Sequence, residues 1–183
     1  QAMDYLAKAK NSLKEGDFVG ALTMAKKGDE VVDAIVAEFE NIEQTITSIQ
    51  EQINTAQNYG VQVTNAEKSI SSAKESLEAR DFESVQAFVR QAKDEISSAL
   101  YSHATECIEV AELVISAGDK LGANLKEPES FLKQSIDAAK SGNFQKSIEL
   151  SSEGTKHAED IIKIHVSNTM ASVELAMYDA ENV

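Results

Sequence analysis

Three short motifs divide the chain at nearly equal intervals: Gly16-Asp17-Phe18, Arg80-Asp81-Phe82 and Gly142-Asn143-Phe144. The first two lie 64 residues apart and the last two 62. Each motif follows a short segment with helical apolar periodicity and precedes a much longer one. A pattern that returns at this period indicates an array of helical units. The sequence therefore predicts an all-α fold made of tandem units.

Composition agrees with helices and excludes several classes of partner. One Pro and eight Gly among 183 residues leave few forced breaks in a helix. The net charge of −14 repels nucleic-acid phosphate, so we expect no nucleic-acid partner. No uncharged apolar run of 18 residues exists, so we expect no direct membrane insertion. The single cysteine, Cys107, excludes an intramolecular disulfide.

The first motif separates a short helix at residues 2–15 from a long one. Gly16 suits a left-handed helix cap, and Asp17 suits the N-cap of the next helix. That helix should run from Phe18 to about Asn58, roughly 60 Å at 1.5 Å per residue. Its apolar stripe alternates steps of three and four, as in a coiled-coil seam: Val32, Ile35, Phe39, Ile42, Ile46, Ile49, Ile53 and Ala56.

The other elements follow the same order. Turn signals occur at 58–60 and 117–124. Short helices are predicted at about 65–79 and from 127–129 onward. Long helices are predicted from 82 to about 116 and from 144 to near the end. The inward positions of the first of these short helices are Ala66, Ile70, Ala73 and Leu77, and those of the next are Phe131, Leu132, Ile136 and Ala139. The second long helix carries the stripe Val85, Val89, Ala92, Ile96, Ala99, His103, Cys107, Val110 and Val114.

The period of about 63 residues predicts three-helix bundles in which each long helix closes one bundle and opens the next. The predicted units are a partial two-helix bundle at 1–37, full bundles at 38–100 and 101–163, and the start of another at 164–183. A chain that begins and ends within a unit is expected to be a segment of a longer array. Gly28, Ala92 and Gly154 fall at one repeat position, where small residues indicate close helix packing or, alternatively, a groove.

This organisation resembles the spectrin-type repeat, in which three-helix bundles share continuous helices. The resemblance covers the whole chain at the level of topology and implies a rod-like spacer or scaffold with protein partners. Locally, Leu13-x-x-Gly16-Asp17-Phe18-x-x-Ala21-Leu22 and residues 142–148 resemble the hairpin turn of tetratricopeptide repeats. That likeness implies antiparallel helix hairpins.

Motifs that carry chemistry are scarce. The sequence contains no phosphate loop, Cys-x-x-Cys pair, His-Glu-x-x-His or nucleophile elbow. His103 and Cys107 are spaced to supply two soft metal ligands, and His157, Asp160 and His165 share one helix. His103 and His165 also fall at the repeat position of Phe39, which favours a helix seam. The sequence therefore predicts no catalytic, cofactor-binding or metal-binding residue, and no cofactor.

Three functions remain open on these observations. The first is a non-enzymatic spacer or scaffold with protein partners, which includes end-to-end self-association as a hypothesis. The second is a helical sensor domain that binds a ligand or peptide in a groove. The third is an enzyme or metalloprotein, for which the sequence offers only the histidines and Cys107.

Overall fold

The predicted all-α fold class is confirmed. A computed structural model describes residues 1–181, which form six α-helices and no β-strand. Short and long helices alternate along the chain: α1 (Ala2–Lys14), α2 (Phe18–Asn58), α3 (Thr64–Glu78), α4 (Phe82–Lys120), α5 (Lys126–Lys140) and α6 (Phe144–Glu181). The last two residues of the predicted segment 164–183 lie outside the described residues.

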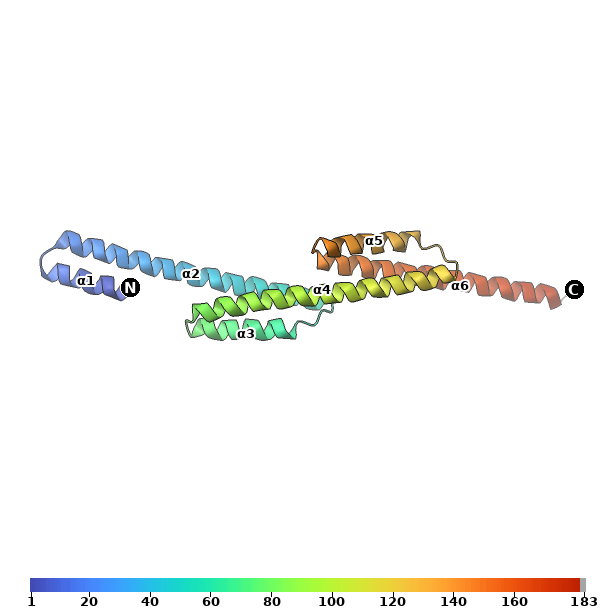
Figure 1. Ribbon diagram of the computed structural model, residues 1–183, viewed down its shortest axis with the longest axis horizontal. Coiled ribbons are helices and arrows are strands. Elements are labelled where there is room, and N and C mark those ends of the chain that lie inside the picture. The colour runs from blue at the N-terminus through green and yellow to red at the C-terminus, as the bar shows by residue number, and fades with distance from the viewer. Residues whose placement is uncertain (182–183) are drawn as a thin grey trace.

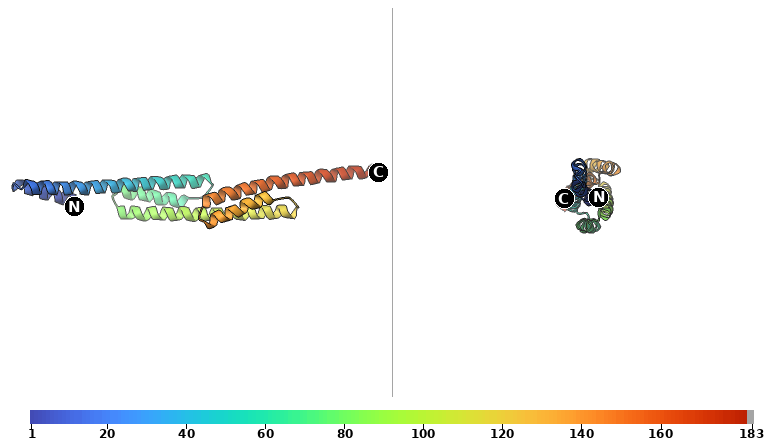
Figure 2. Two further views of the ribbon diagram at one scale, coloured as in Figure 1. Left: turned by 90° about the horizontal axis from the view of Figure 1, so that it is seen from above. Right: turned by 90° about the vertical axis from the view of Figure 1, so that its left-hand side faces the viewer.

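All six helices run close to one common axis (Figure 1). The α1–α2 turn lies at one end of that axis, and the end of α6 lies at the other. The view turned by 90° shows the same order, and the end-on view gathers the helices around the axis (Figure 2). The long helices α2, α4 and α6 point in one direction, and the short helices run back between them.

The long helix α4 has two sets of neighbours. It contacts α2 and α3, which also contact each other, and it contacts α5 and α6, which again contact each other. Helix α1 packs on α2. Because α4 spans 39 residues, it is long enough to meet one helix hairpin along each half.

The larger core lies among α2, α3 and α4, and the start of α6 adds the buried Ile148 to it. Its fully buried side chains include Ile49, Ile53, Ile70 and Val85. All four positions predicted to point inward on α3 are buried, from Ala66 to Leu77. Burying an Ile or Val side chain stabilises a fold by about 1.5–3 kcal/mol, so this cluster is the main apolar support of the described chain.

A smaller core joins the second half of α4 to α5 and α6. Ile115, Ala123, Leu125 and Ala158 are its buried apolar members. Buried serines connect α5 and α6: the Ser135 hydroxyl donates to the Ser147 carbonyl at 2.8 Å. These bonds satisfy the polar groups that the close helix contact buries, which is the condition for burying them at low cost. Of the inward positions predicted for α5, none is fully buried, whereas Ser135 is.

The turns between short and long helices form as the motifs predict. Gly16 has φ +81°, in the left-handed region, and the Asp17 carboxylate accepts a hydrogen bond from the Gly20 N–H at 2.9 Å. Asp81 caps α4 in the same way through the Ser84 N–H at 3.1 Å. At the second turn a non-glycine residue, Arg80, takes the left-handed conformation with φ +60°.

The predicted end of α4 at about Ser116 is wrong. The helix continues to Lys120, and the left-handed turn residue is Gly122, with φ +79°. Gly118 therefore lies inside the helix and is buried, and a β-carbon there would fall 2.5 Å from a methyl of Leu125. This glycine serves close packing rather than helix termination, a difference that composition alone does not show.

Candidate functional site

The residues His103 and Cys107, singled out by their spacing, lie together in the structure. The His103 Nε2 and Cys107 Sγ atoms are 3.7 Å apart. Both residues line a hollow of about 380 Å³ between α4 and α6, which Lys156 and Glu159 border from the α6 side. The second half of α4 thus brings the predicted pair of possible metal ligands to a surface depression.

The chemistry available in this hollow is weak. Burial, followed by the charge of Glu106, raises the pKa of the Cys107 thiol. A thiol that stays protonated is a poor nucleophile and a poor metal ligand. Among the described residues, no group of three or more His, Cys, Asp or Glu side chains is arranged to hold a metal ion.

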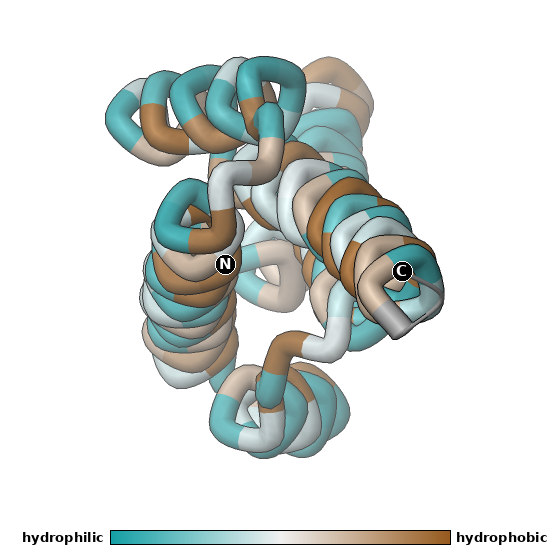
Figure 3. The backbone as a smooth tube through the Cα atoms, turned by 90° about the vertical axis from the view of Figure 1, so that its right-hand side faces the viewer, coloured by the Kyte–Doolittle hydropathy of each residue, from teal (hydrophilic) through white to brown (hydrophobic). Residues whose placement is uncertain are grey.

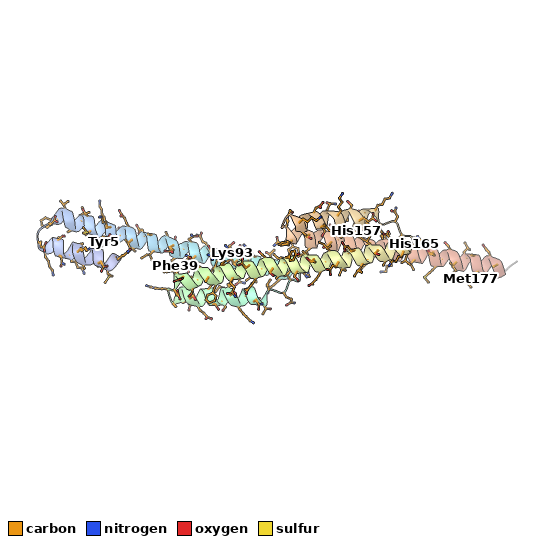
Figure 4. All side chains as sticks on the ribbon, in the orientation of Figure 1. Tyr5, Phe39, Lys93, His157, His165 and Met177 are labelled. Atoms are coloured by element: carbon orange, nitrogen blue, oxygen red, sulfur yellow. The ribbon has the colours of Figure 1, made fainter. Side chains whose placement is uncertain are left out.

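The other histidines contact separate partners. His157 lies on α6 beside α5 (Figure 4). Its Nδ1 is 3.6 Å from a Glu127 oxygen, and its ring is edge-on to Phe131. His165 bonds through Nε2 to the Leu121 carbonyl at 2.9 Å. Since a carbonyl only accepts, Nε2 carries the proton there. Both histidines therefore contact a neighbouring helix or its end. Asp160, which the sequence places on the same helix as these histidines, is exposed.

The small residues at one repeat position lie where helices approach closely. Ala92 is fully buried in the larger core. A β-carbon on Gly28 would lie 3.4 Å from the Tyr5 Cβ, and one on Gly154 would lie 2.9 Å from the Phe131 Cβ. Neighbouring side chains fill the space at both glycines, which supports the packing interpretation over the groove.

The second half of α6 displays apolar side chains without a covering helix among residues 1–181. Every residue from 166 to 180 is exposed. The end view shows apolar residues recurring along this part of α6 (Figure 3), and Met177 marks its position near the end (Figure 4). We define the α6 stripe as the residues of this part with the spacing 4, 3 and 4: Val166, Met170, Val173 and Met177.

A second apolar surface lies on the α1–α2 hairpin, where α2 extends beyond α1. We define the α1–α2 face as Leu6, Val32, Ile35 and Val36, all of which are exposed. Val32, Ile35 and Val36 correspond, 64 residues later in the chain, to Ile96, Ala99 and Leu100. Those three residues are buried or half-buried. The predicted apolar stripe of α2 includes Val32 and Ile35, and the prediction that they face a helix seam did not show that they are exposed. Apolar periodicity does not show which turns of a helix are covered by a neighbouring helix.

No family model, curated protein or solved structure matches this chain. No helix within residues 1–181 is long and apolar enough to cross a membrane. The α6 stripe and the α1–α2 face are candidates for a functional surface because their apolar side chains are exposed.

Proposed function

We propose that the chain is a non-enzymatic, rod-like segment of a longer protein, which acts as a spacer or scaffold and engages protein partners. The observation that carries this proposal is the sharing of α4 between two helix hairpins. Because one uninterrupted helix belongs to both packing groups, the units are joined by a stiff element rather than by a flexible linker.

The proposed units are the three-helix bundles at 38–100 and 101–163, with partial units at 1–37 and 164–183, in an order like that of spectrin repeats. The mutual contacts of α2, α3 and α4 support the first bundle, and those of α4, α5 and α6 support the second. The bond from the Tyr59 hydroxyl to the Glu149 carboxylate, at 2.6 Å, supports a fixed angle where they meet. A spacer needs such a joint, because it must hold its ends at a set distance.

A ligand-binding sensor is the alternative, and the hollow beside His103 and Cys107 is the observation that favours it. Lys156 and Glu159 offer both signs of charge at its rim. A small ligand there should raise the thermal stability of the protein, because binding to the folded state alone shifts the folding equilibrium. A library of small charged molecules that gives no thermal shift contradicts this alternative.

Small-angle X-ray scattering at low concentration tests the rod. If α2, half of α4 and half of α6 lie end to end, the maximum dimension of the protein should exceed about 100 Å at 1.5 Å per residue. A compact domain of this length has a radius of gyration of only about 16 Å. A value near the compact one shows that the helices fold back on one another and contradicts the spacer.

A further inference from the structure

We propose that a groove between α4 and α6 binds an amphipathic helix of a partner protein, with an apolar face and with lysine or arginine along one edge. The proposal deepens the proposed scaffold function and rests on it, because it names the kind of partner and the place where that partner docks. The groove lies where the second half of α4 runs beside the first half of α6 (Figures 1 and 2).

Mostly apolar side chains form the floor and one wall of this groove. Cys107 and Val110 of α4 and Thr155 of α6 line the hollow of about 380 Å³. Leu113 continues the same side of α4 by one turn, because residues three positions apart are neighbours on a helix surface. Val110 is 49% exposed and Leu113 is 71% exposed. We define the α4–α6 groove as these four residues.

The second half of α2 provides a comparison within the chain. Gly60 and Gly122 hold the left-handed turns after α2 and α4, and they lie 62 residues apart. The same shift aligns Ile53 with Ile115, and both are buried. The two helix halves therefore have the same register relative to the turns that follow them, so their exposed positions can be compared one by one.

The positions of the groove are apolar on α4 and polar on α2. Cys107, Val110 and Leu113 correspond at this shift to three polar residues: Thr45, Ser48 and Glu51. Ser48 and Glu51 are exposed, as Val110 and Leu113 are. Since α2 forms and packs with polar residues at these positions, the fold does not require apolar ones on α4. We attribute them to contact with another molecule.

The other helices of the rod leave this surface open. Val110 and Leu113 stay exposed although α1, α2 and α3 precede them, and Ser48 and Glu51 stay exposed although α5 and α6 follow. A further unit that packs as the present ones do would therefore not cover the α4–α6 groove.

The charges at the rim differ between the two sides of the groove. The α4 side carries three exposed carboxylates: Glu106, Glu109 and Glu112. No Lys or Arg occurs from residue 94 to residue 119, and His103 lies beside Glu106, 3.8 Å away. The α6 side is mixed: Lys156, Glu159 and Lys163. A partner with basic side chains along the edge that lies over α4 is therefore complementary in charge.

The shape of the surface favours a helix as the occupant. An amphipathic helix places anchors at positions i, i+3, i+4 and i+7 into an apolar groove, whereas an added strand needs an exposed sheet edge. Residues 1–181 contain no strand, and the backbone groups of α4 and α6 bond within their own helices. Leu113 is not among the residues that line the hollow, so an occupant that also covers Leu113 is longer than a small molecule in the hollow.

A designed peptide serves as the probe. It has about 18 residues, with leucine at the positions i, i+3, i+4 and i+7 of each pair of turns and lysine elsewhere. A scrambled peptide of the same composition has no apolar stripe, and a third peptide carries glutamate in place of lysine. Fluorescence anisotropy of each labelled peptide, with the protein added up to about 1 mM, should show binding at least about tenfold tighter for the first than for either control.

Substitutions in the protein separate groove binding from charge attraction. Leu113→Glu gives α4 the residue that α2 has at this position, and Leu113 is exposed, so the fold should be unaffected. Charge attraction alone predicts tighter binding of the lysine peptide by this variant, whereas loss of the apolar contact should weaken binding at least about tenfold. Ser48→Glu is the control, because it adds the same charge at the exposed position of α2 that corresponds to Val110, and it should not weaken binding.

Three results overturn the proposal: no binding of the leucine–lysine peptide up to about 1 mM, equal binding of the scrambled peptide, or unchanged or tighter binding by Leu113→Glu. A small charged molecule that raises thermal stability equally in the unaltered chain and in Leu113→Glu, without peptide binding, would assign the hollow to a small ligand instead. Failure of the rod shows independently, as a compact scattering profile of the protein without peptide.

Discussion

The distance to a neighbouring helix decides which helical glycine tolerates a side chain. Gly28 and Gly154 occupy the same position in the predicted repeat, ten residues after the turn phenylalanine. A β-carbon on Gly28 would lie 3.4 Å from the Tyr5 Cβ, which is an ordinary contact, whereas one on Gly154 would lie only 2.9 Å from the Phe131 Cβ. The Phe131 Cβ is attached directly to the backbone of α5 and cannot move aside as the end of a long side chain can.

We therefore expect opposite effects from the same substitution. Gly154→Ala should lower the free energy of unfolding by about 1–3 kcal/mol, because the overlap with α5 forces the helices apart. Gly28→Ala should raise it by up to about 1 kcal/mol, because alanine favours the helix and finds room. Urea unfolding followed by circular dichroism measures both changes. Equal effects of the two substitutions would contradict the difference in packing.

One hydrogen bond between side chains joins the turn after α2 to helix α6. The Tyr59 hydroxyl donates to the Glu149 carboxylate at 2.6 Å. This bond, with a smaller contribution from Lys146, lowers the pKa of Glu149, and the same bond raises the pKa of Tyr59. Since the folded pKa of Glu149 is below its unfolded value, the stabilisation is present above the unfolded pKa and is lost as the pH falls through the folded one.

Replacement of Tyr59 by Phe should consequently destabilise the protein in a pH-dependent way. The difference in stability from the unaltered chain should be full near pH 7 and shrink below about pH 4.3, the ordinary pKa of glutamate. It should also shrink as the pH rises through the pKa of Tyr59, above about pH 10, because the tyrosinate cannot donate. Thermal unfolding across this range measures it. Tyr101→Phe is the control, because the contact of the Tyr101 ring with Phe144 survives the loss of the hydroxyl.

At the scale of the helices, the sequence predicts which helices exist and their order along the chain better than it predicts which face of each helix is buried. Turn motifs and capping residues place most helix ends within about two residues, since a left-handed glycine or an aspartate cap acts locally. The end of α4 was missed because Gly118 and Gly122 look alike in sequence, and only the contact of Gly118 with Leu125 distinguishes them.

The buried face of α4 could not be predicted for a related reason. Its predicted stripe continues through His103, Cys107 and Val110, but the structure buries Ala104 and Ala111 instead. The first half of α4 faces α2 and α3 and the second half faces α5 and α6, so the covered side moves around the helix. The exposed faces escaped prediction as well, because their residues have the same apolar periodicity as buried ones.

The three short-helix turns share one backbone shape but not one residue. Gly16 and Gly142 hold φ near +80°, and Arg80 holds +60° at the corresponding position. A residue with a β-carbon is strained in this region by about 1–2 kcal/mol, which glycine avoids. The turn between α3 and α4 is therefore the strained member of the set.

Arg80→Gly should relieve this strain and raise the free energy of unfolding by about 1 kcal/mol, after allowance for the greater freedom of glycine in the unfolded chain. Gly16→Ala should lower it by a similar amount at the equivalent turn, where a β-carbon would meet no atom within 4 Å and only the backbone is affected. Denaturant unfolding compares the two. A neutral result for both would show that these turns adapt their backbone.

For the whole molecule, α4 is the element that makes two hairpins into one body. The larger core uses its first half together with Ala104 near the middle, and the smaller core uses its second half; Ile148 of α6 also belongs to the larger core. In the proposed array, stability would be set by each unit and by the junction with its neighbour. An intact α4 should therefore make residues on both sides unfold together.

A proline in the middle of α4 tests this coupling. Thr105→Pro removes one helical hydrogen bond and clashes with the preceding turn, which costs about 3 kcal/mol or more. Calorimetry should show one transition for the unaltered chain and two for the variant, because the α2–α3 and α5–α6 hairpins no longer share a rigid helix.

Thr169→Pro in the exposed half of α6 is the matched control for this experiment. Thr105 and Thr169 both bond through the hydroxyl to the carbonyl four residues earlier, at 2.9 Å in each case. The break at Thr169 separates no packed groups among the described residues, so at low concentration the main transition should keep its midpoint. If Thr105→Pro also leaves a single transition, side contacts such as Tyr59 with Glu149 couple the hairpins, and the shared helix is not what makes the molecule one unit.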